Sequence, residues 1–267
     1  MYPTLTRRRA ATAIVTAALL LPLAACGSDG KTAGGATSDG SGSSAPSADL
    51  TVLAASSLTD VFKTEAAAYE KQRPGTKINF SFAGSQELAA QVKQGAPADV
   101  LATADTKTMD GLKQDTGTPS IFAKNRLVIV VGKGNPDRVA TLKDLADTKL
   151  KVVLAAPEVP VGRYSKQILD AQKIVVKPVS QEPNVRAVLS KVELGEADAG
   201  LVYKTDAATA PGKVGTVAIP DAQNAVASYP VATLKTSKHA AAAASFAKWL
   251  ATPEAQKILR DAGFQRP

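Results

Sequence analysis

The stretch "LTVLAASSLTDVF" (residues 50–62) runs an apolar segment directly into two serines and then into a helical pattern. The "LTVLAA" segment predicts a buried strand, and the apolar residues that follow it recur at helical spacing. A buried strand followed at once by an amphipathic helix is the repeating unit of an α/β fold. Ser56 and Ser57 lie where the strand ends and the helix begins.

The same alternation continues along the rest of the chain. Strands are predicted over residues 50–55, 77–83, 98–104, 125–136, 151–157, 173–179, 199–203 and 213–219. Helices are predicted over residues 58–72, 85–95, 162–172, 184–197, 239–251 and 252–263. In the last helix Thr252 is the expected N-cap and Gly263 the stop. This order predicts mostly parallel sheets covered by helices, with ligand sites beyond the carboxyl ends of the strands.

Length and composition favour a globular protein with two lobes. The chain has 267 residues, 45% of them hydrophobic, and its mean hydropathy is −0.03. Of the formal charge of +8, Arg7, Arg8 and Arg9 precede Cys26, which leaves +5 for the remainder. With only 4% aromatic residues, this modest charge argues against nucleic-acid binding and fits a small anion or an anionic membrane surface.

The N-terminal region predicts export and lipid anchoring. Residues 1–25 combine a basic start, a short apolar run and small residues, as in a signal peptide. "LAAC" (residues 23–26) resembles a lipobox, which implies acylation of Cys26 after cleavage. A plain signal peptide with a chance cysteine is the alternative, and the arginine run leaves Sec and twin-arginine export both open. Residues 26–47 are rich in Gly and Ser, so we expect a flexible tether.

The chain holds one cysteine and one histidine, Cys26 and His239. An intramolecular disulfide is therefore excluded, and a structural zinc site of the usual spacing is not expected. The fold must be stabilised by its core.

Four of the strand-to-helix junctions share a chemical character. Each helix start presents backbone N–H groups without an intrahelical acceptor and a partial positive charge, which favours anions. Serine hydroxyls add donors at two of the junctions, and the other two have aliphatic residues that offer only the backbone. The junction residues are Ser57, Ser85 (after Gly84), Val161 (before Gly162) and Val185 (after Asn184).

Capping is the competing explanation for these polar residues. Ser57 and Asp60 have the spacing of a capping box, and Asn184 suits an N-cap. The spacing alone does not show that four helices converge, so capping and binding both stay open. We expect Ser57 to serve both roles and Ser56 to form the turn.

Several segments together resemble one family. These are "VLAASSLTDVF", "SFAGSQELAAQVKQGAPADVLATAD", "PEVPVGRY", "EPNVRAVLSKVELGEADAGLVYKTDA" and "YPVATLK". In this order they are similar to the ModA family of molybdate-binding proteins of ABC importers, over residues 50–267. The resemblance implies an α/β fold of the two-lobed periplasmic binding protein type (type II), with two chain crossings and a ligand cleft between the lobes. We expect residues 48–127 and 222–267 in the first lobe and residues 128–221 in the second.

The resemblance also implies the ligand residues. Hydroxyl donors are Ser57, Ser85 and Tyr203, and backbone N–H donors are Val161 and Val185. Some relatives have serine where this chain has Gly84, and alanine where it has Val161, which leaves the pocket volume undetermined.

The implied function is capture of molybdate, and of tungstate as an anion of nearly the same size, for an ABC permease and its ATPase. The protein is expected to be a monomer on the outer face of the cell membrane, on the periplasmic side if two membranes are present, held through Cys26. No cofactor, nucleic-acid partner or direct protein–metal ligand is implied, because molybdenum is bound as its oxyanion.

The donor set suits an unprotonated dianion. Molybdate carries no proton near neutral pH and needs only donors, which hydroxyl and amide groups provide. Protonated phosphate also needs an acceptor, and leaving its proton unpaired costs about 1–3 kcal/mol. Sulfate makes the same hydrogen bonds as molybdate, so a binding protein for sulfate or another small anion is the alternative.

A serine hydrolase or acyltransferase is the remote alternative. Ser245 and Lys248 form an S-x-x-K string, but it lies in the alanine-rich helix without partner motifs. A triad needs His239, which is expected at the surface. Asp99 and Asp105 flank "VLATA" (residues 100–104) and are a further pair of carboxylates to weigh for acid/base chemistry. Arg163 and Arg186 follow two junctions and are expected on solvated helix faces or over the cleft.

Overall fold

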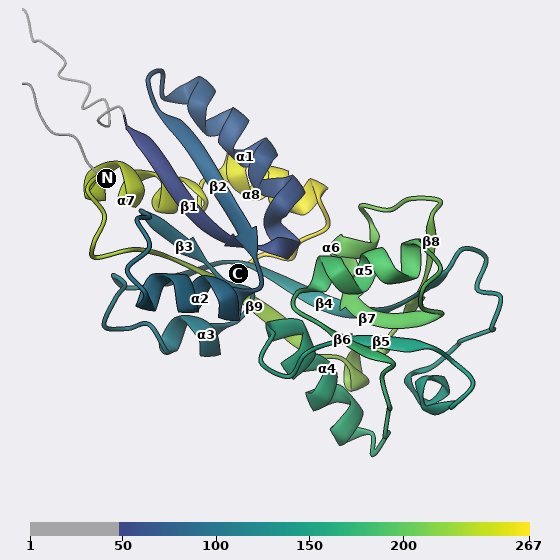
Figure 1. The fold of residues 1–267 in the computed structure, drawn as a ribbon. Coiled ribbons are helices and arrows are strands. Elements are labelled where there is room, and N and C mark those ends of the chain that lie inside the picture. Colours follow the sequence, from purple (N-terminus) through teal and green to yellow (C-terminus); the bar gives the residue numbers. More distant parts are fainter. Residues whose placement is uncertain (1–47) are drawn as a thin grey trace, which may run out of the picture. The chain divides into compact units, whose positions relative to one another are not determined.

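The computed structural model describes residues 48–267 (Figure 1). The predicted signal peptide, Cys26 and the predicted tether lie outside the described residues. Within residues 48–267, no helix has both the length and the apolar character needed to cross a membrane.

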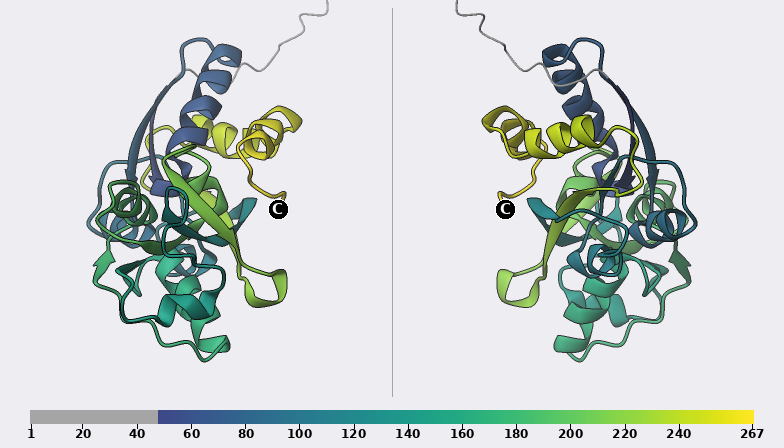
Figure 2. Two further views of the ribbon diagram at one scale, coloured as in Figure 1. Left: turned by 90° about the vertical axis from the view of Figure 1, so that its right-hand side faces the viewer. Right: turned by 90° about the vertical axis from the view of Figure 1, so that its left-hand side faces the viewer.

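The first lobe is built on parallel strands from the N-terminal half of the chain. β1 (Asp49–Ala55) pairs in parallel with β2 (Lys77–Ala83) on one side and with β3 (Val100–Ala102) on the other. The helices around them are α1 (Thr59–Gln72), α2 (Ser85–Lys93), α3 (Thr106–Asp110), α7 (Ala240–Trp249) and α8 (Pro253–Asp261). A 3₁₀ turn, Ser56–Leu58, connects β1 to α1. The C-terminal helix α8 packs beside α1 (Figure 2).

The second lobe repeats the parallel arrangement. β5 (Val152–Ala155) pairs in parallel with β6 (Ser180–Glu182) and β7 (Ala199–Tyr203). Its helices are α4 (Pro160–Ala171), α5 (Val185–Glu193) and α6 (Lys204–Ala207), with 3₁₀ turns over Leu142–Ala146 and Asp221–Gln223. β8 (Val214–Ala218) joins this lobe through an antiparallel pairing with β4.

Two strands connect the lobes. β4 (Ser120–Gly132) and β9 (Val226–Thr233) pair antiparallel over the first half of β4, and the second half of β4 pairs with β7 and β8. The change of partner falls between Arg126 and Leu127. The sheet order is β2-β1-β3-β9-β4-β7-β5-β6, so one curled sheet continues through both lobes. The predicted two-lobed α/β fold with two chain crossings is confirmed.

Three expectations about the elements are wrong or incomplete. Residues 173–179 form no strand; β6 begins only at Ser180. β9 and the short helix α3 were not predicted. Four of the strand pairings are antiparallel against four parallel ones, so the sheet is mixed, and every antiparallel pairing involves β4 or β9.

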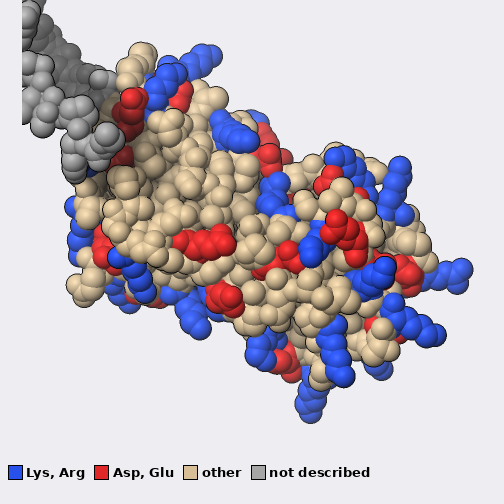
Figure 3. Space-filling view, in the orientation of Figure 1, with Lys and Arg blue, Asp and Glu red and all other residues tan. Residues whose placement is uncertain are grey.

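The first lobe has an aromatic core that joins the two ends of the chain. Phe62 of α1 packs edge-on against Phe246 of α7 with ring centroids 6.3 Å apart, and Tyr69 lies 5.4 Å from Trp249. Edge-to-face contacts of this kind stabilise a folded protein by more than the burial of their apolar area alone. On the face shown in Figure 3, basic and acidic side chains of residues 48–267 are interspersed, so no single sign of charge dominates it.

Candidate functional site

A small cavity lies between the lobes, where the carboxyl ends of β1 and β2 meet helix starts. The space in it that a water-sized sphere can occupy is about 10 Å³, and Ala55 and Ala83, the last residues of those strands, form part of its wall. All five predicted ligand residues line it: Ser57, Ser85, Val161, Val185 and Tyr203. The first two come from the first lobe and the other three from the second.

Ser57 lies in the 3₁₀ turn before α1 and is buried. Its Oγ lies 3.0 Å from the phenol oxygen of Tyr229 on β9. Neither this turn nor α1 has a side-chain cap, so the expectation that Ser57 caps its helix with Asp60 is wrong. Asp60 instead forms an ion pair with Arg186 at 2.7 Å. The turn is tighter than an α-helix start, which directs the Ser57 hydroxyl inward.

Ser85 is the first residue of α2 and is almost fully buried. Its Oγ accepts a hydrogen bond from the Ala104 backbone N–H at 3.0 Å. The Glu87 carboxylate accepts from the Gly84 N–H at 3.1 Å and so stabilises this helix start. With its oxygen used as an acceptor, the Ser85 hydroxyl keeps its own hydrogen for the cavity.

The helices α4 and α5 supply backbone donors. Val161 follows Pro160, the first residue of α4, and Val185 is the first residue of α5. N–H groups in the first turn of a helix have no intrahelical acceptor. The Asn184 side chain accepts from the Ala187 N–H at 3.0 Å, so the predicted Asn184 cap is confirmed and the Val185 N–H remains free of it.

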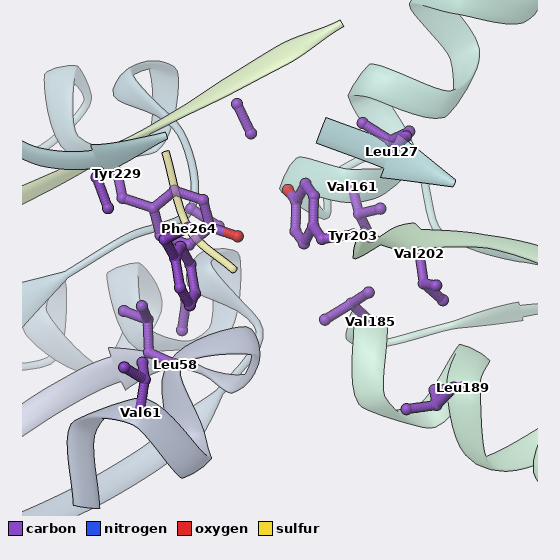
Figure 4. Packing of buried hydrophobic residues seen from close by; sticks show 14 of the residues in the cluster. Leu58, Val61, Leu127, Val161, Val185, Leu189, Val202, Tyr203, Tyr229 and Phe264 are labelled. Carbon is purple, nitrogen blue, oxygen red and sulfur yellow. The ribbon is translucent and has the colours of Figure 1, made fainter. Parts of the chain in front are cut away.

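Tyr203 ends β7 and is 1% exposed. Among the described residues its hydroxyl has no hydrogen-bond partner, which is rare for a buried polar group. Burial raises the pKa of Tyr203 well above its ordinary value, so the phenol remains a neutral donor. Figure 4 shows Tyr203 with Val161 and Val185 on one side, facing Tyr229 and Leu58 on the other.

Charged side chains join the lobes on either side of the cavity. Arg163 of α4 donates through Nε to Asp105 at 2.9 Å and through a second nitrogen to Thr108 Oγ1 at 2.7 Å. Arg186 of α5 pairs with Asp60 in the first lobe. Of the two alternatives for these arginines, solvated helix faces or a position over the cleft, the structure shows the second, since both bridge the cleft. In the sequence, the only signal for this role of the two arginines was that each lies one or two residues after a junction.

The buried acid Asp206 holds Arg186 in place. Its Oδ1 lies 2.6 Å from Arg186 Nε, and its side chain is fully buried. Burial raises the pKa of Asp206 to about 6, while the guanidinium opposes that rise. Since both arginines are paired with carboxylates, the positive potential at the cavity comes from the helix starts.

Gly84 lies close to the backbone of the other lobe. A Cβ at this position would overlap the Pro183 carbonyl oxygen, from the segment before α5. The Gln86 side chain donates to that same carbonyl at 2.8 Å. The lack of a side chain at Gly84 therefore lets the two lobes meet.

Tyr229 does not line the cavity but contacts Ser57, which does, and sequence reasoning missed it. It is fully buried behind Ser57. The only signal was its place in the "YPVATLK" segment, to which no role was assigned.

The residues of the hydrolase alternative do not come together. Ser245 does not line the cavity, and no hydrogen bond among the described residues joins it to His239 or Lys248. His239 lies 3.4 Å from Asp99, which also accepts from Ser237 at 2.5 Å. Larger hollows of about 520 and 780 Å³ lie elsewhere on the second lobe, away from the four helix starts.

Comparisons with known proteins agree with this geometry. Residues 50–265 match the bacterial extracellular solute-binding protein family. The chain is 39% identical over 259 residues to the molybdate-binding protein ModA of Mycobacterium tuberculosis, covering 96% of this chain and 97% of that protein.

Two solved structures share the fold. The Azotobacter vinelandii periplasmic molybdate-binding protein superposes with a TM-score of 0.70 at 24% identity, covering 82% of this chain and 99% of that one. The sulfate-binding protein SubI of Mycobacterium tuberculosis gives 0.73 at 21% identity, covering 82% and 86%. At these identities the likeness shows the fold alone, and it does not distinguish one anion from another.

Proposed function

The chain belongs to the molybdate-binding ModA family of bacterial extracellular solute-binding proteins, and we propose that it captures molybdate for an ABC importer. The observation that carries this proposal is the convergence of Ser57, Ser85, Val161, Val185 and Tyr203 on one cavity. The relatives that are named molybdate-binding proteins support the choice of anion.

Under this proposal the five residues clamp a tetrahedral dianion between the lobes. The hydroxyls of Ser57, Ser85 and Tyr203 donate to its oxygens, together with the N–H groups of Val161 and Val185. Hydrogen bonds to a charged acceptor are about twice as strong as neutral ones, and the helix starts add a favourable field. Tungstate, with nearly the same size and charge, binds in the same way. The protein performs no chemistry and needs no cofactor.

Domain movement follows from the division of the donors between lobes. We assign residues 48–127 and 222–267 to the first lobe and residues 128–221 to the second, with the partner change in β4 as support. A ligand that contacts both lobes binds only the closed state and so shifts an open–closed equilibrium towards it. The closed monomer then delivers the anion to a permease driven by an ATPase.

The cellular setting forms part of the proposal. An extracellular solute-binding protein works outside the cytoplasm, and acylation of Cys26 would keep it at the outer face of the cell membrane. The "LAAC" segment at residues 23–26 supports this anchor, and mass spectrometry of the membrane-associated protein tests it.

The deciding experiment is calorimetric titration of the purified chain with molybdate, tungstate, sulfate and phosphate. We expect tight binding of molybdate and tungstate, with sulfate far weaker. Tight binding of sulfate without molybdate would make this a sulfate receptor. Ser245→Ala, which lies outside the cavity, serves as the control that leaves affinity unchanged.

A further inference from the structure

Three charged side chains outside the cavity form a chain of ion pairs across the cleft. Arg186 of α5 pairs through Nη2 with Asp60 of α1 at 2.7 Å and through Nε with Asp206 of α6 at 2.6 Å. Its remaining nitrogen, Nη1, donates to Thr209 Oγ1 at 3.1 Å. Each guanidinium nitrogen therefore has a partner, and together the partners fix the plane of the group. None of these four residues lines the cavity.

Within the second lobe, the pair of Arg186 and Asp206 ties together two segments that carry predicted ligand residues. Arg186 directly follows Val185, in the first turn of α5. Asp206 lies in α6, three positions after Tyr203, the last residue of β7. The Asp206 side chain is fully buried and that of Arg186 is 25% exposed, so water screens this pair little. The pair therefore sets the start of α5 relative to the end of β7.

The contact with Asp60 extends this link to the first lobe. Asp60 lies in the first turn of α1, three positions after Ser57, and α5 packs against the 3₁₀ turn that contains Ser57. The pair of Arg186 with Asp206 is internal to one lobe and does not depend on closure. The pair with Asp60 exists only while the lobes are together. Arg186 is thus held by its own lobe in the position from which it meets Asp60.

We propose that Arg186 is a positioning residue that retains the bound anion: Asp206 holds it ready in the second lobe, and its pairing with Asp60 on closure sets the donors of the two lobes against each other. This inference rests on the proposed function and adds residues that act on the ligand only through the donors they position. The pair with Asp60 forms after the anion has entered. It therefore slows release and leaves the rate of capture unchanged.

A direct electrostatic role for Asp60 predicts the opposite result from a positioning role. A carboxylate near an anion site repels the ligand, so its removal strengthens binding if charge alone matters. Under the proposal its removal weakens binding, because the closed state loses a contact between the lobes. The sign of the change in affinity separates the two roles.

The test is the Asp60→Asn variant of the full chain. Release of radiolabelled molybdate into an excess of unlabelled anion gives the dissociation rate, and calorimetry gives the affinity. Asp60 is 56% exposed, so its pair with Arg186 is partly screened. We expect release to accelerate by about two- to fivefold and the affinity to fall by the same factor. Unchanged release, or tighter binding, would overturn the inference.

Asp110→Asn is the matched control. Asp110 is 54% exposed and pairs with Lys113 of the same lobe at 3.2 Å, so the change removes the same charge without touching the second lobe. It should leave both release and affinity as they are in the unaltered chain. An equal acceleration in both variants would mean that net charge, and not the contact with Arg186, controls release.

A second variant tests the guanidinium itself. Arg186→Lys keeps the charge but offers one nitrogen, which cannot reach both carboxylates and Thr209 together. Because Asp206 is fully buried and needs a counter-charge most, we expect the lysine to pair with it and to leave Asp60 alone. Affinity should then fall by about tenfold, since the start of α5 also loses its fixed position.

The double variant of Asp60→Asn and Arg186→Lys decides whether the two residues act together. Asp60→Asn should accelerate release little further when Arg186 is already replaced. A second acceleration of the full size would show that Asp60 acts independently of Arg186, and the inference would be wrong. Melting curves of each variant confirm that the measured protein is folded.

The outcomes separate this inference from the function beneath it. If the unaltered chain binds none of molybdate, tungstate, sulfate and phosphate, the proposed function is wrong and this inference falls with it. If it binds sulfate in place of molybdate, the proposed function alone is wrong, and the same variants are measured with labelled sulfate. If it binds molybdate and Asp60→Asn releases it at the unaltered rate, only the role of Arg186 is wrong.

Discussion

At the scale of single residues, two of the cavity hydroxyls, those of Ser57 and Ser85, already make a hydrogen bond within the protein. In Ser85 the oxygen accepts from the Ala104 N–H, and the hydroxyl hydrogen has no partner among the described residues. Ser85 therefore has two separable effects. Its hydroxyl hydrogen is available to a ligand, whereas its oxygen stabilises the fold by accepting from the Ala104 N–H.

We predict that Ser85→Ala lowers molybdate affinity by about 10- to 150-fold, because a hydrogen bond to a charged group contributes about 1.5–3 kcal/mol. The lost acceptor for the Ala104 N–H should also lower the free energy of unfolding by about 1 kcal/mol. Calorimetry measures the first effect and urea denaturation the second. A variant that loses stability but keeps full affinity would show that Ser85 is structural only.

Gly84 leads to a prediction about closure. Gly84→Ala places a Cβ against the Pro183 carbonyl of the other lobe, so the closed state becomes strained. Overpacking of this kind costs about 1–3 kcal/mol, and we expect affinity to fall by about tenfold while the melting temperature without ligand changes little. Titration and melting curves together provide the readout.

Gly111→Ala is the control for that variant, because a Cβ there meets the backbone oxygens of Thr108 and Lys107 at ordinary distances of 3.4 and 3.8 Å. It should retain full affinity. Should Gly84→Ala bind as tightly as Gly111→Ala, the contact between Gly84 and Pro183 does not belong to the binding state.

At the scale of elements, the packing of α1 against α8 buries an acid. Glu65 on α1 is fully buried, and neither of its carboxyl oxygens has a hydrogen-bond partner among the described residues. Burial, and the nearby Glu254 of α8, raise the pKa of Glu65 from 4.5 to about 9. The carboxyl therefore stays protonated in the folded protein at neutral pH.

A stability profile follows from this shift. Above pH 4.5 the unfolded chain loses this proton while the folded chain keeps it until about pH 9, so stability falls as pH rises through that window. The slope from this residue is about 1.4 kcal/mol per pH unit. Glu65→Gln cannot titrate, so it should be the more stable form in the upper part of the window.

Urea denaturation at a series of pH values measures this difference. Glu158→Gln, which changes an exposed glutamate, should keep the profile of the unaltered chain. Parallel profiles for Glu65→Gln and the unaltered chain would mean that Glu65 is ionised in the folded state.

The strands also show how much of the fold can be predicted from sequence patterns. β2 and β7 were predicted at their observed bounds, because each is a short apolar or alternating run with clear ends. β9 was missed because Pro230 interrupts it, and proline argues against a strand with two neighbours. The structure accommodates this proline where the register with β4 shifts, between Ile121 and Ala123.

For the candidate site, too, some residues could be predicted from the sequence and others could not. The resemblance gave the five predicted ligand residues, which belong to local segments at helix starts. Tyr229 and the two bridging arginines could not be read from local patterns, because their partners lie far along the chain. Ser57 and Tyr229, for example, are separated by 172 positions. The Ser57–Asp60 capping box is not formed, because Ser57 contacts Tyr229 and Asp60 pairs with Arg186 instead.

At the scale of the whole molecule, the lobes are held together by more than the cavity. Arg163 and Asp105 pair across the cleft with side chains only 22% and 5% exposed. A partly buried pair of this kind depends on both members, since removing one leaves the other charged and poorly solvated. In an open form both side chains would regain water.

We predict that Arg163→Gln and Asp105→Asn each lower molybdate affinity, although neither residue lines the cavity. The double variant should lose less than the sum of the two, with a coupling energy of about 1–3 kcal/mol. Calorimetry on the four proteins gives this value. Asn keeps the cap that Asp105 provides to Thr108, so α3 is preserved.

Lys166→Gln breaks an exposed pair with Asp170 inside α4 and should leave affinity unchanged. Strictly additive losses in the Arg163 and Asp105 variants would refute a role for this pair in closure.

The path of the chain has a consequence for how the protein is made. The core of the first lobe needs Phe246 and Trp249 of α7 against Phe62 and Tyr69 of α1. During synthesis or export the N-terminal strands emerge early, but the helices that complete their core emerge last. Contacts so distant along the chain form slowly. The first lobe must therefore remain incompletely folded until the C-terminus has emerged, although β4 to β8, the strands that the second lobe uses, have all emerged before it.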